Sequence, residues 1–378
     1  MRFHMPTRVI FGPGSLSGLK HLVGEELKAE KLFLVTDRGI RASGIAERVL
    51  DLFPGTPVFD AVEPNPRNTT VDRAGEKVRE IKPDLIIGLG GGSVLDAAKA
   101  IALLGANPGK IEDYEGRARY KAAPLPMVAV PTTCGTGSEV TWVAVITHSG
   151  RKFKMSIKGP EMYPAAAVVD PDLLKSLPKD LVASTGLDAL THAVEAYTVK
   201  PSTPVTDLFA REALRLIFGS LEKAYEDIQG YDQAREDLML GSTLAGFAFG
   251  NSDVGAVHCI AESVGSVYDT PHGVANSIFL PVVMEYNLPV TAVRYAEIAR
   301  IAGIKEPEDE QAAKLLVKKV RDMARRLNIP FLHETGVEEG RLLELARKSF
   351  ENNSTPSNPR EATEADYLDM LQKAFHRG

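Results

Sequence analysis

The sequence predicts an α/β domain with a parallel sheet, followed by an all-helical domain. In the first half of the chain, apolar runs of strand length alternate with amphipathic helical segments, which is typical of a parallel sheet covered on both faces. After Pro178 the runs of β-branched residues give way to helical periodicity. We therefore expect an α/β domain over residues 1–178 and an all-helical domain over residues 179–378.

Each strand expected in the first domain is a short, mostly apolar run that ends at a polar or turn-forming residue. The runs cover residues 8–11, 31–36, 58–60, 84–89, 127–130 and 165–169. Helical periodicity lies between them, over residues 16–28 and 45–53, after Thr69 or Thr70, and from Val94 onward. Residues 142–147 and 153–157 alternate in polarity and predict an antiparallel pair, with Ser149 and Gly150 in its turn.

The helices of the second domain are predicted from the spacing of apolar residues. One begins at Thr203 and Pro204, a capping residue followed by a proline in the first turn. Further helical patterns cover residues 232–250, 252–267, 308–328, 337–350 and 363–376. No strand pattern of comparable quality follows Pro178, so we expect this domain to consist of helices alone.

Composition and charge exclude several classes of protein. The net charge is −6 and no basic tract stands out, so we expect no nucleic-acid partner. No run of about 18 apolar residues exists, and the N-terminus is too short and polar for a signal peptide, so we expect no membrane segment. Two cysteines, Cys134 and Cys259, make no disulfide framework and fit a reducing compartment. These features predict a soluble protein of the cytoplasm.

Four residues of the second domain have the chemical types and spacing of a metal site. Asp188 and His192 lie four residues apart in a helical segment, so their side chains share one helix face. His258 and His272 follow, and carboxylate and imidazole groups together can hold one divalent ion. The alternative is that Asp188 caps a helix starting at Ala189 and that the histidines are ordinary core residues. We favour one site formed by all four residues.

A glycine-rich turn follows the strand expected at residues 84–89. Gly90, Gly91, Gly92 and Ser93 precede a helix, where backbone N–H groups can close on a phosphate. The turn matches neither a Walker loop nor the Gly-x-Gly-x-x-Gly fingerprint. The alternative is a tight turn that needs several residues with positive φ. Four glycines in five residues exceed what such a turn needs and favour phosphate binding.

A second polar loop, residues 131–141, follows the strand expected at 127–130. Its threonines stand at the carboxyl end of a parallel strand, where ligands bind in open α/β sheets. They could therefore line a cofactor or a substrate, and an ordinary solvent loop is the alternative.

Four motifs in this order resemble those of the iron-containing, group III alcohol dehydrogenases. They are Gly-Gly-Gly-Ser at 90–93, Pro-Thr-Thr-x-Gly-Thr-Gly-Ser-Glu-Val-Thr at 131–141, Thr-Gly-x-Asp-Ala-Leu-x-His-Ala at 185–193 and Thr-Pro-His-Gly-x-Ala-Asn at 270–276. The resemblance extends from Phe11 to Glu361. It implies a dehydroquinate synthase-like architecture with a Rossmann-like nucleotide domain and a catalytic metal in the cleft between the domains. The metal ligands that it implies are Asp188, His192, His258 and His272.

The cofactor contacts that the resemblance implies fall on two loops and two single residues. The loops contribute Gly90, Gly91, Gly92 and Ser93 at the pyrophosphate, and Thr132, Thr133 and Thr136 at the nicotinamide and its ribose. Lys154 matches a lysine that reaches the cofactor, and Asp37 falls at the adenosine ribose. A carboxylate there accepts hydrogen bonds from ribose hydroxyls and repels a 2′-phosphate, so we expect NAD over NADP. A turn residue at a strand end is the alternative for Asp37.

One position departs from the family pattern. Many members carry a histidine four residues after the third ligand, where this chain has Glu262. A carboxylate so near a metal shuttles protons only if burial raises its pKa, so Glu262 is either a proton-transfer group or a partner that orients a ligand histidine. Phe249 matches a position that lines the substrate cavity, and Trp142, just past the threonine loop, is a further pocket candidate. An ordinary core position is the alternative for both aromatic residues.

The activity that the resemblance implies is hydride transfer between NAD and a short primary alcohol or diol, or the matching aldehyde. Oxygen and imidazole donors suit iron, zinc, nickel and manganese alike, and iron is the family expectation. The family also implies a homodimer or a larger homo-oligomer.

Three other activities fit parts of the pattern. A glycerol-type zinc polyol dehydrogenase shares the fold but resembles the chain less. A lyase of the dehydroquinate synthase kind needs a basic cluster for its phosphorylated acid, and the motifs have none beside them. A scaffold that binds NAD without catalysis is the third alternative, and the complete ligand and glycine motifs argue against it.

Overall fold

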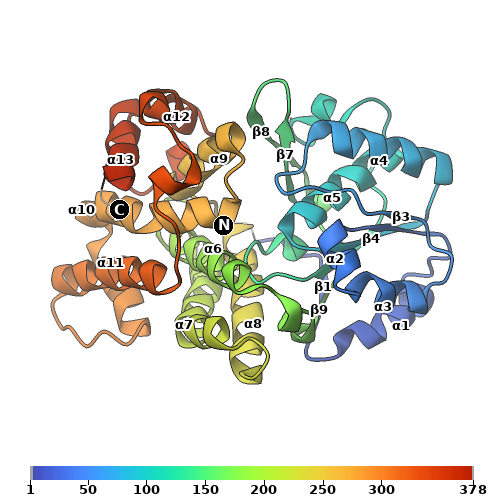
Figure 1. The fold of residues 1–378 in the computed structure, drawn as a ribbon, viewed down its shortest axis with the longest axis horizontal. Coiled ribbons are helices and arrows are strands. Elements are labelled where there is room, and N and C mark those ends of the chain that lie inside the picture. Colours follow the sequence, from blue (N-terminus) through green and yellow to red (C-terminus); the bar gives the residue numbers. More distant parts are fainter. Residues whose placement is uncertain (1–2, 377–378) are drawn as a thin grey trace. The chain divides into compact units, whose positions relative to one another are not determined.

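The chain divides into two compact units, which we call the α/β unit and the helical unit. The computed structural model describes residues 3–376. Residues 1–2 of the first expected domain and residues 377–378 of the second lie outside the described residues. The α/β unit comprises Met5–Thr133 and Gly137–Leu177 and contains every strand of the described residues (Figure 1). The helical unit comprises residues 178–376 with 134–136 and 3–4, and within its described part the regular structure is helical.

Six parallel strands form the main sheet of the α/β unit, in the order β1-β9-β6-β4-β2-β3. Their bounds are β1 Arg8–Phe11, β2 Leu32–Val35, β3 Val58–Phe59, β4 Leu85–Gly90, β6 Met127–Pro131 and β9 Ala166–Val169. The four central strands are buried along their whole length, which explains why their sequences are apolar without alternation. The prediction of a parallel sheet with these six strands is confirmed.

Helices cover both faces of this sheet because successive strand residues point into two different apolar clusters. Phe33 and Ile86 point into one cluster, which is completed by α4 (Asn68–Ile81) and α5 (Gly92–Ala106). Leu34 and Ile87 point into the other cluster. That cluster is completed by α3 (Ile45–Leu52) and by the helical turns of residues 15–26, which include α1 (Leu19–His21).

The strand register brings three loops to one edge of the sheet. Val35 of β2 pairs with Gly88 of β4, and Gly88 pairs with Ala129 of β6. The loops that follow these strands therefore start side by side. Thr36, the first residue after β2, donates through Oγ1 to the carbonyl oxygen of Leu89 in β4 over 2.8 Å. This carboxyl edge is where parallel sheets bind their ligands.

The predicted antiparallel pair lies outside the main sheet. β7 (Val143–His148) and β8 (Phe153–Lys158) pair antiparallel, and β5 (Gly116–Arg117) adds to β8 in parallel. The connection at residues 149–152 includes the two predicted turn residues, so this prediction is confirmed.

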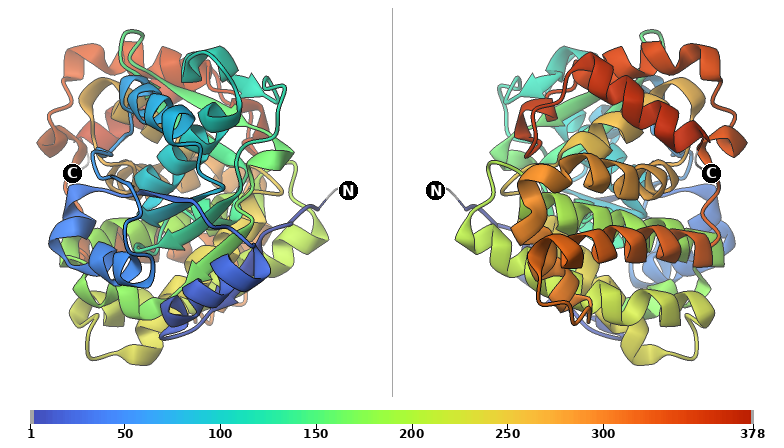
Figure 2. Two further views of the ribbon diagram at one scale, coloured as in Figure 1. Left: turned by 90° about the vertical axis from the view of Figure 1, so that its right-hand side faces the viewer. Right: turned by 90° about the vertical axis from the view of Figure 1, so that its left-hand side faces the viewer.

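Eight α-helices form the helical unit within the described residues. They are α6 Lys179–Thr198, α7 Pro204–Glu226, α8 Asp232–Phe249, α9 Ala256–Tyr268, α10 His272–Ile301, α11 Asp309–Arg326, α12 Leu342–Phe350 and α13 Glu364–His376. α6 is buried along most of its length and packs against α7, α8 and α10. Figure 2 shows α11 lying beside α10 in the right-hand view. Thr203 caps α7, as its sequence predicts, by accepting from the Thr206 N–H over 3.2 Å.

The structure corrects several helical predictions. The sequence pattern does not predict α10, because Pro281 and Pro289 lie inside it and disguise a helix of 30 residues. α9 begins at Ala256 and not at 252, and α12 begins after a 3-10 turn at Glu339–Arg341 and not at 337. The helix expected over residues 16–28 is a succession of 3-10, α and π turns.

The helices of residues 3–376 include no candidate membrane span. None of these helices is both long enough and apolar enough to traverse a bilayer.

Candidate active site

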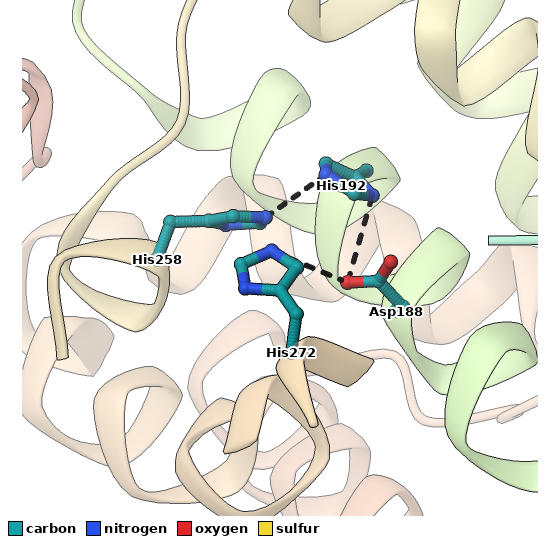
Figure 3. Close-up of side chains that lie close together, drawn as sticks. All are labelled: Asp188, His192, His258 and His272. Atoms are coloured by element: carbon teal, nitrogen blue, oxygen red, sulfur yellow. Dashed lines mark hydrogen bonds and ion pairs between the residues drawn. The ribbon is translucent and has the colours of Figure 1, made fainter. Parts of the chain in front are cut away.

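Four side chains converge inside the helical unit (Figure 3). Asp188 and His192 stand one turn apart on α6, His258 lies in the first turn of α9, and His272 begins α10. Each side chain offers one ligand atom, and the four atoms all lie within 4.8 Å of one another. One carboxylate and three imidazoles, the set predicted from the sequence, are thus assembled from three helices.

The start of α10 approaches α6 closely enough to bring His272 into this cluster. The neighbouring Gly273 makes this approach feasible, because a Cβ there would lie 2.6 Å from the carbonyl oxygen of Ser184. Asp188 occupies the buried interior of α6, which begins at Lys179. The alternative in which Asp188 caps a helix is therefore wrong.

The cluster is buried, and its nitrogen atoms face one another. His192 Nε2 and His258 Nε2 are 2.9 Å apart, and Asp188 Oδ1 lies 3.9 Å from both His192 Nδ1 and His272 Nε2. Burial lowers the pKa of His192 to about 4, so its ring is neutral at pH 7 and carries a lone pair. The His272 side chain is 27% exposed, and it is the member of the cluster in contact with solvent.

The hydrogen-bond contacts of the Asn276 amide indicate whether a cation fits this cluster. Its Nδ2 lies 2.6 Å from Asp188 Oδ1 and 3.1 Å from Nε2 of both His258 and His272. An amide group has two N–H bonds, so it satisfies at most two of these three acceptors. Lone pairs therefore outnumber donors in a buried space, and a divalent cation would relieve that imbalance. The residues fit a metal ion.

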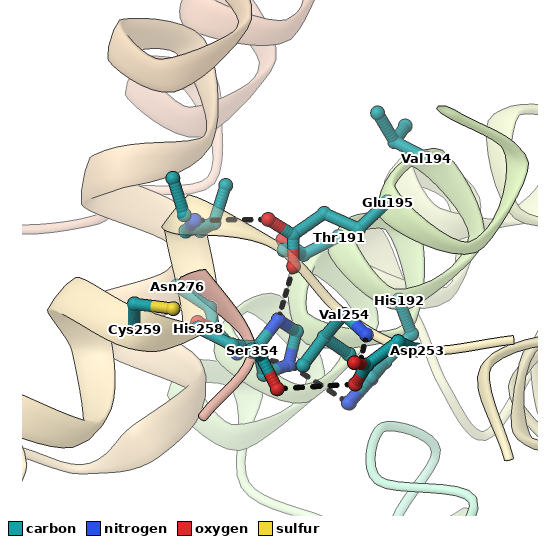
Figure 4. Close-up of polar contacts among 12 residues, drawn as sticks. Thr191, His192, Val194, Glu195, Asp253, Val254, His258, Cys259, Asn276 and Ser354 are labelled. Carbon is teal, nitrogen blue, oxygen red and sulfur yellow. Dashed lines mark hydrogen bonds and ion pairs between the residues drawn. The ribbon is translucent and has the colours of Figure 1, made fainter. Parts of the chain in front are cut away.

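Glu195 lies on the same face of α6 as Asp188 and His192, and it is not among the site residues predicted from the sequence. Its Oε2 lies 2.5 Å from His258 Nδ1, and its Oε1 accepts from the Val257 N–H over 2.8 Å (Figure 4). Burial by itself would lower the pKa of His258, but the charge of Glu195 and this hydrogen bond raise it. The sequence does contain a signal, because Asp188, His192 and Glu195 stand at i, i+4 and i+7 of one helix.

Two of the three predicted pocket residues belong to the helical unit. Phe249, the last residue of α8, stacks on the ring of His192 with centroids 4.2 Å apart. Glu262 lies one turn after His258 on α9 and accepts a hydrogen bond from Asn352 Nδ2 over 2.7 Å. The nitrogen of His258 that points away from the cluster is bound by Glu195, and not by Glu262.

The third predicted pocket residue, Trp142, belongs to the α/β unit. The guanidinium of Arg117 lies over its ring, 4.9 Å from the centroid. Trp142 is partly buried, and it precedes β7, just after the threonine loop.

The glycine turn leads from β4 into α5, which begins at Gly92 with Gly91 as its N-cap. Of the glycines between Gly88 and Gly92, only Gly90 has a positive φ, at +157°. The alternative of a turn that needs several positive φ values is therefore wrong. A Cβ on Gly91 would lie 3.0 Å from Thr133 Cγ2, so this glycine also allows the two loops to approach each other. The first N–H groups of α5, which include that of Ser93, have no acceptor within the helix and can bind an anion.

The other predicted cofactor residues have contacts of different kinds. Asp37 caps α2 (Arg38–Ala42) by accepting from the Ile40 N–H over 2.9 Å, so it is a helix cap and not only a turn residue. Thr132 is buried, and its Oγ1 makes no hydrogen bond to another described residue. Lys154 donates to Asn65 Oδ1 over 2.8 Å. Thr136 belongs to the helical unit and is partly buried.

The parallel sheet with its glycine turn, together with a helical unit that holds an Asp-His-His-His cluster, defines the class as metal-dependent dehydrogenases. Residues 6–171 match the family model of iron-containing alcohol dehydrogenases, and residues 182–375 match the C-terminal model of the Fe-containing alcohol dehydrogenase family. The chain belongs to the iron-containing alcohol dehydrogenase family, so the resemblance of its four motifs is confirmed. It is an oxidoreductase that interconverts alcohols and aldehydes.

Individual relatives match the chain over almost its full length. The NAD-dependent methanol dehydrogenase of Bacillus methanolicus is 37% identical over an alignment of 386 positions, which covers 99% of each chain. The 1,3-propanediol dehydrogenase of Citrobacter freundii is 37% identical over 98% of each chain. A crystal structure of a 1,3-propanediol oxidoreductase superposes with a TM-score of 0.94 at 36% identity, over 99% of each chain.

Proposed function

We propose that the enzyme transfers a hydride between NAD and a short primary alcohol or diol, or the matching aldehyde, at a bound divalent metal. The observation that carries this proposal is the convergence of Asp188, His192, His258 and His272, whose ligand atoms lie within 4.8 Å of one another. Two relatives are named for methanol and 1,3-propanediol, which supports a small, uncharged substrate.

Iron is the metal that we propose, and zinc or nickel suits the same donors. A metal held by these four side chains would polarise the oxygen of the alcohol or aldehyde. The protein prepares the site in three ways. Burial keeps His192 neutral, Glu195 holds the ring of His258, and Phe249 covers one face of His192.

We propose that residues 1–178 bind NAD and that residues 179–378 carry the metal and the catalytic groups. The pyrophosphate would lie on the glycine turn at Gly90, Gly91, Gly92 and Ser93, since the first turn of α5 offers free N–H groups there. The nicotinamide and its ribose would contact Thr132, Thr133, Thr136 and Lys154, and the unpaired buried hydroxyl of Thr132 supports this. Asp37 would bind the adenosine ribose and favour NAD over NADP. One relative is NAD-dependent by name, which agrees with this choice.

Phe249 and Glu262 are the residues that we propose for the substrate pocket, with Trp142 as a further candidate from the α/β unit. Glu262 shares a face of α9 with His258, so it is close enough to act on a proton there or to shape the pocket. The variant Glu262→Gln separates these roles. A pH profile of kcat that matches the wild type removes Glu262 from the proton path.

We also propose that the enzyme forms a homodimer or a larger homo-oligomer, as the family resemblance implies. A cytoplasmic, reducing environment is supported by its two buried cysteines, which are both free thiols. Sedimentation analysis of the purified protein tests the oligomeric state.

The first experiment measures metal content and turnover in one preparation. The protein is purified without air, its iron, zinc and nickel are quantified, and NADH oxidation is followed on a panel of short aldehydes. We expect one equivalent of metal that rises and falls with activity. The variants Asp188→Ala and His272→Ala should lose both, whereas Leu343→Ala, at an exposed position of α12, should keep both.

The same preparation discriminates the alternatives. Net oxidation of NADH excludes a lyase of the dehydroquinate synthase kind, which consumes no net cofactor. Activity restored by zinc, with a preference for glycerol, would favour the polyol dehydrogenase. A protein that takes up no metal under any loading condition would refute the four-ligand site.

A further inference from the structure

Glu195 uses both carboxylate oxygens on one neighbouring helix. It is 4% exposed and projects from α6 towards the first turn of α9. Oε2 lies 2.5 Å from Nδ1 of His258, and Oε1 accepts from the backbone N–H of Val257 over 2.8 Å. Figure 4 shows the carboxylate between the two helices. A carboxylate buried with two partners on a single turn is arranged to hold that turn in place.

The contact with Nδ1 determines which nitrogen of His258 is available to a metal. A carboxylate accepts a hydrogen bond, so Nδ1 must carry the proton in this pair. In the neutral ring the lone pair then belongs to Nε2, which faces His192 Nε2 at 2.9 Å. Glu195 thus selects the tautomer that presents its lone pair to the ligand cluster.

The contact with Val257 gives α9 a cap that its own sequence does not supply. The N-cap residue, Gly255, has no side chain to bind the free N–H groups of the first turn. Asn358 Oδ1 accepts from the Ala256 N–H over 3.2 Å, and Glu195 accepts from the next N–H group. A negative charge at a helix N-terminus is also favourable for the helix dipole. The same carboxylate therefore fixes the start of α9 and the ligand that this start carries.

Gly255 leaves room for these two capping side chains. A Cβ at this position would lie 3.0 Å from Glu195 Oε1 and 3.0 Å from Asn358 Oδ1. A methyl group there would push on both caps at once, without any change of charge.

We propose that Glu195 is a positioning residue for the metal site, which acts through His258 and has no contact of its own with the substrate. It holds His258 in the tautomer and orientation that direct Nε2 to the metal, and it ties α9 to the helix that bears Asp188 and His192. This inference rests on the proposed function, since it needs a metal at the cluster. Losing such a partner of a metal-bound histidine weakens metal affinity by about 10- to 100-fold.

The test compares Zn²⁺ affinities of apo-proteins by competition with a chromophoric chelator. In Glu195→Gln an NH2 group replaces one carboxylate oxygen, and this group can only donate. If it faces Val257, it opposes another N–H donor. If it faces Nδ1 of His258, it requires the tautomer of His258 whose proton is on Nε2. We expect its Kd for Zn²⁺ to rise by about 10- to 100-fold. Gly255→Ala should also raise the Kd for Zn²⁺, because its methyl group would push on Glu195.

A matched control changes a carboxylate that binds α6 away from the cluster. Glu297 Oε2 pairs with the hydroxyl of Tyr197 and, over 3.3 Å, with Arg211. Glu297→Gln should bind Zn²⁺ as the wild type does. The visible spectrum of the Co²⁺-loaded proteins adds a readout that general destabilisation does not move. We expect the ligand-field bands to shift in Glu195→Gln and to stay unchanged in Glu297→Gln.

The outcomes separate this inference from the proposed function. If the wild type binds metal and oxidises NADH, while Glu195→Gln matches it in Zn²⁺ affinity and Co²⁺ spectrum, Glu195 is not a positioning residue. If the wild type binds no metal at all, the proposed function fails first. Circular dichroism verifies folding, and if Glu195→Gln does not fold, the Zn²⁺ affinity of Gly255→Ala decides in its place.

Discussion

Phe249 stacks on His192, with ring centroids 4.2 Å apart and planes inclined by only 19°. The phenyl ring lies at the end of α8, and the imidazole is a member of the four-residue cluster on α6. This stack closes one face of a proposed metal ligand to water and contributes to the burial that keeps the imidazole neutral.

Truncation of this aromatic ring should impair turnover. A stacked ring pair contributes about 0.5–1.5 kcal/mol, so we expect Phe249→Ala to lower kcat/KM for short aldehydes by about 2- to 12-fold. Phe249→Tyr keeps the ring and serves as the control. Steady-state kinetics on aldehydes of increasing length measure the effect. A loss that is equal for both variants would show that the stack itself does not matter.

The carboxylate of Asp37 should set the choice between NAD and NADP. Asp37→Asn keeps an oxygen to cap α2 at Ile40 but removes the negative charge that repels a 2′-phosphate. We expect the ratio of kcat/KM for NADPH to that for NADH to rise by about tenfold, which corresponds to about 1.4 kcal/mol. Paired assays with the two cofactors measure this ratio. A wild-type enzyme that already prefers NADPH would contradict the assignment.

The close approach of α10 to α6 at Gly273 should tolerate no added methyl group. A Cβ there would meet the backbone oxygen of Ser184 at 2.6 Å, and a main-chain atom cannot turn aside as a side chain can. We expect Gly273→Ala to cost about 1–3 kcal/mol and to displace the adjacent His272, so that metal content falls together with Tm. Gly219→Ala in α7 is the control, because nothing lies within 4 Å of its added Cβ. Its Tm should not fall.

The titration of Lys99 should make the stability of the fold change with pH in the alkaline range. Burial lowers the pKa of Lys99 to about 8 from 10.5, although Asp96 and Glu139 favour its charge. Nζ donates to Ser138 Oγ and to the carbonyl oxygen of Val143, each over 2.8 Å. Below pH 8 the folded and unfolded chains both carry the proton, and the folded chain bears the cost of a buried charge. Between pH 8 and 10.5 only the unfolded chain keeps it, so this cost declines as pH rises.

The variant Lys99→Met removes this titration. We therefore expect the Tm of the wild type minus that of Lys99→Met to become more positive between pH 7.5 and pH 10, whatever its value at pH 7.5. Thermal unfolding of both proteins in matched buffers measures the difference. The exposed Lys20→Met serves as a control whose difference stays flat. A flat difference for Lys99→Met as well would mean that the buried amine does not titrate in this range.

Each strand of the main sheet was predictable by itself, because its burial requires an apolar run in its own sequence. A strand covered on both faces must be apolar throughout, so runs such as Leu32–Val35 and Leu85–Gly90 stand out in the sequence. The hairpin of β7 and β8 was predictable for the opposite reason, since it is half exposed and alternates in polarity.

The helical unit was predictable only where local signals agree with tertiary packing. Thr203 and Pro204 predict the start of α7. Pro281 and Pro289 argue against a helix where α10 lies, and packing on α6 and α11 stabilises α10 in spite of them. The metal-ligand candidates could be named from residue type and spacing. Glu195 could not be recognised as the partner of His258, because their contact joins two helices whose register the sequence does not state.

The four candidate ligands come from α6, α9 and α10, and none of these helices carries more than two of them. The unfolded chain therefore lacks the site, and a metal that binds only the native helical unit stabilises it by mass action. At a free metal concentration about 100 times its Kd this linkage adds about 2.7 kcal/mol, a large share of the stability of a typical domain. Metal starvation would then remove more than catalysis, because it would expose the helical unit to proteolysis and shorten the lifetime of the enzyme in the cell.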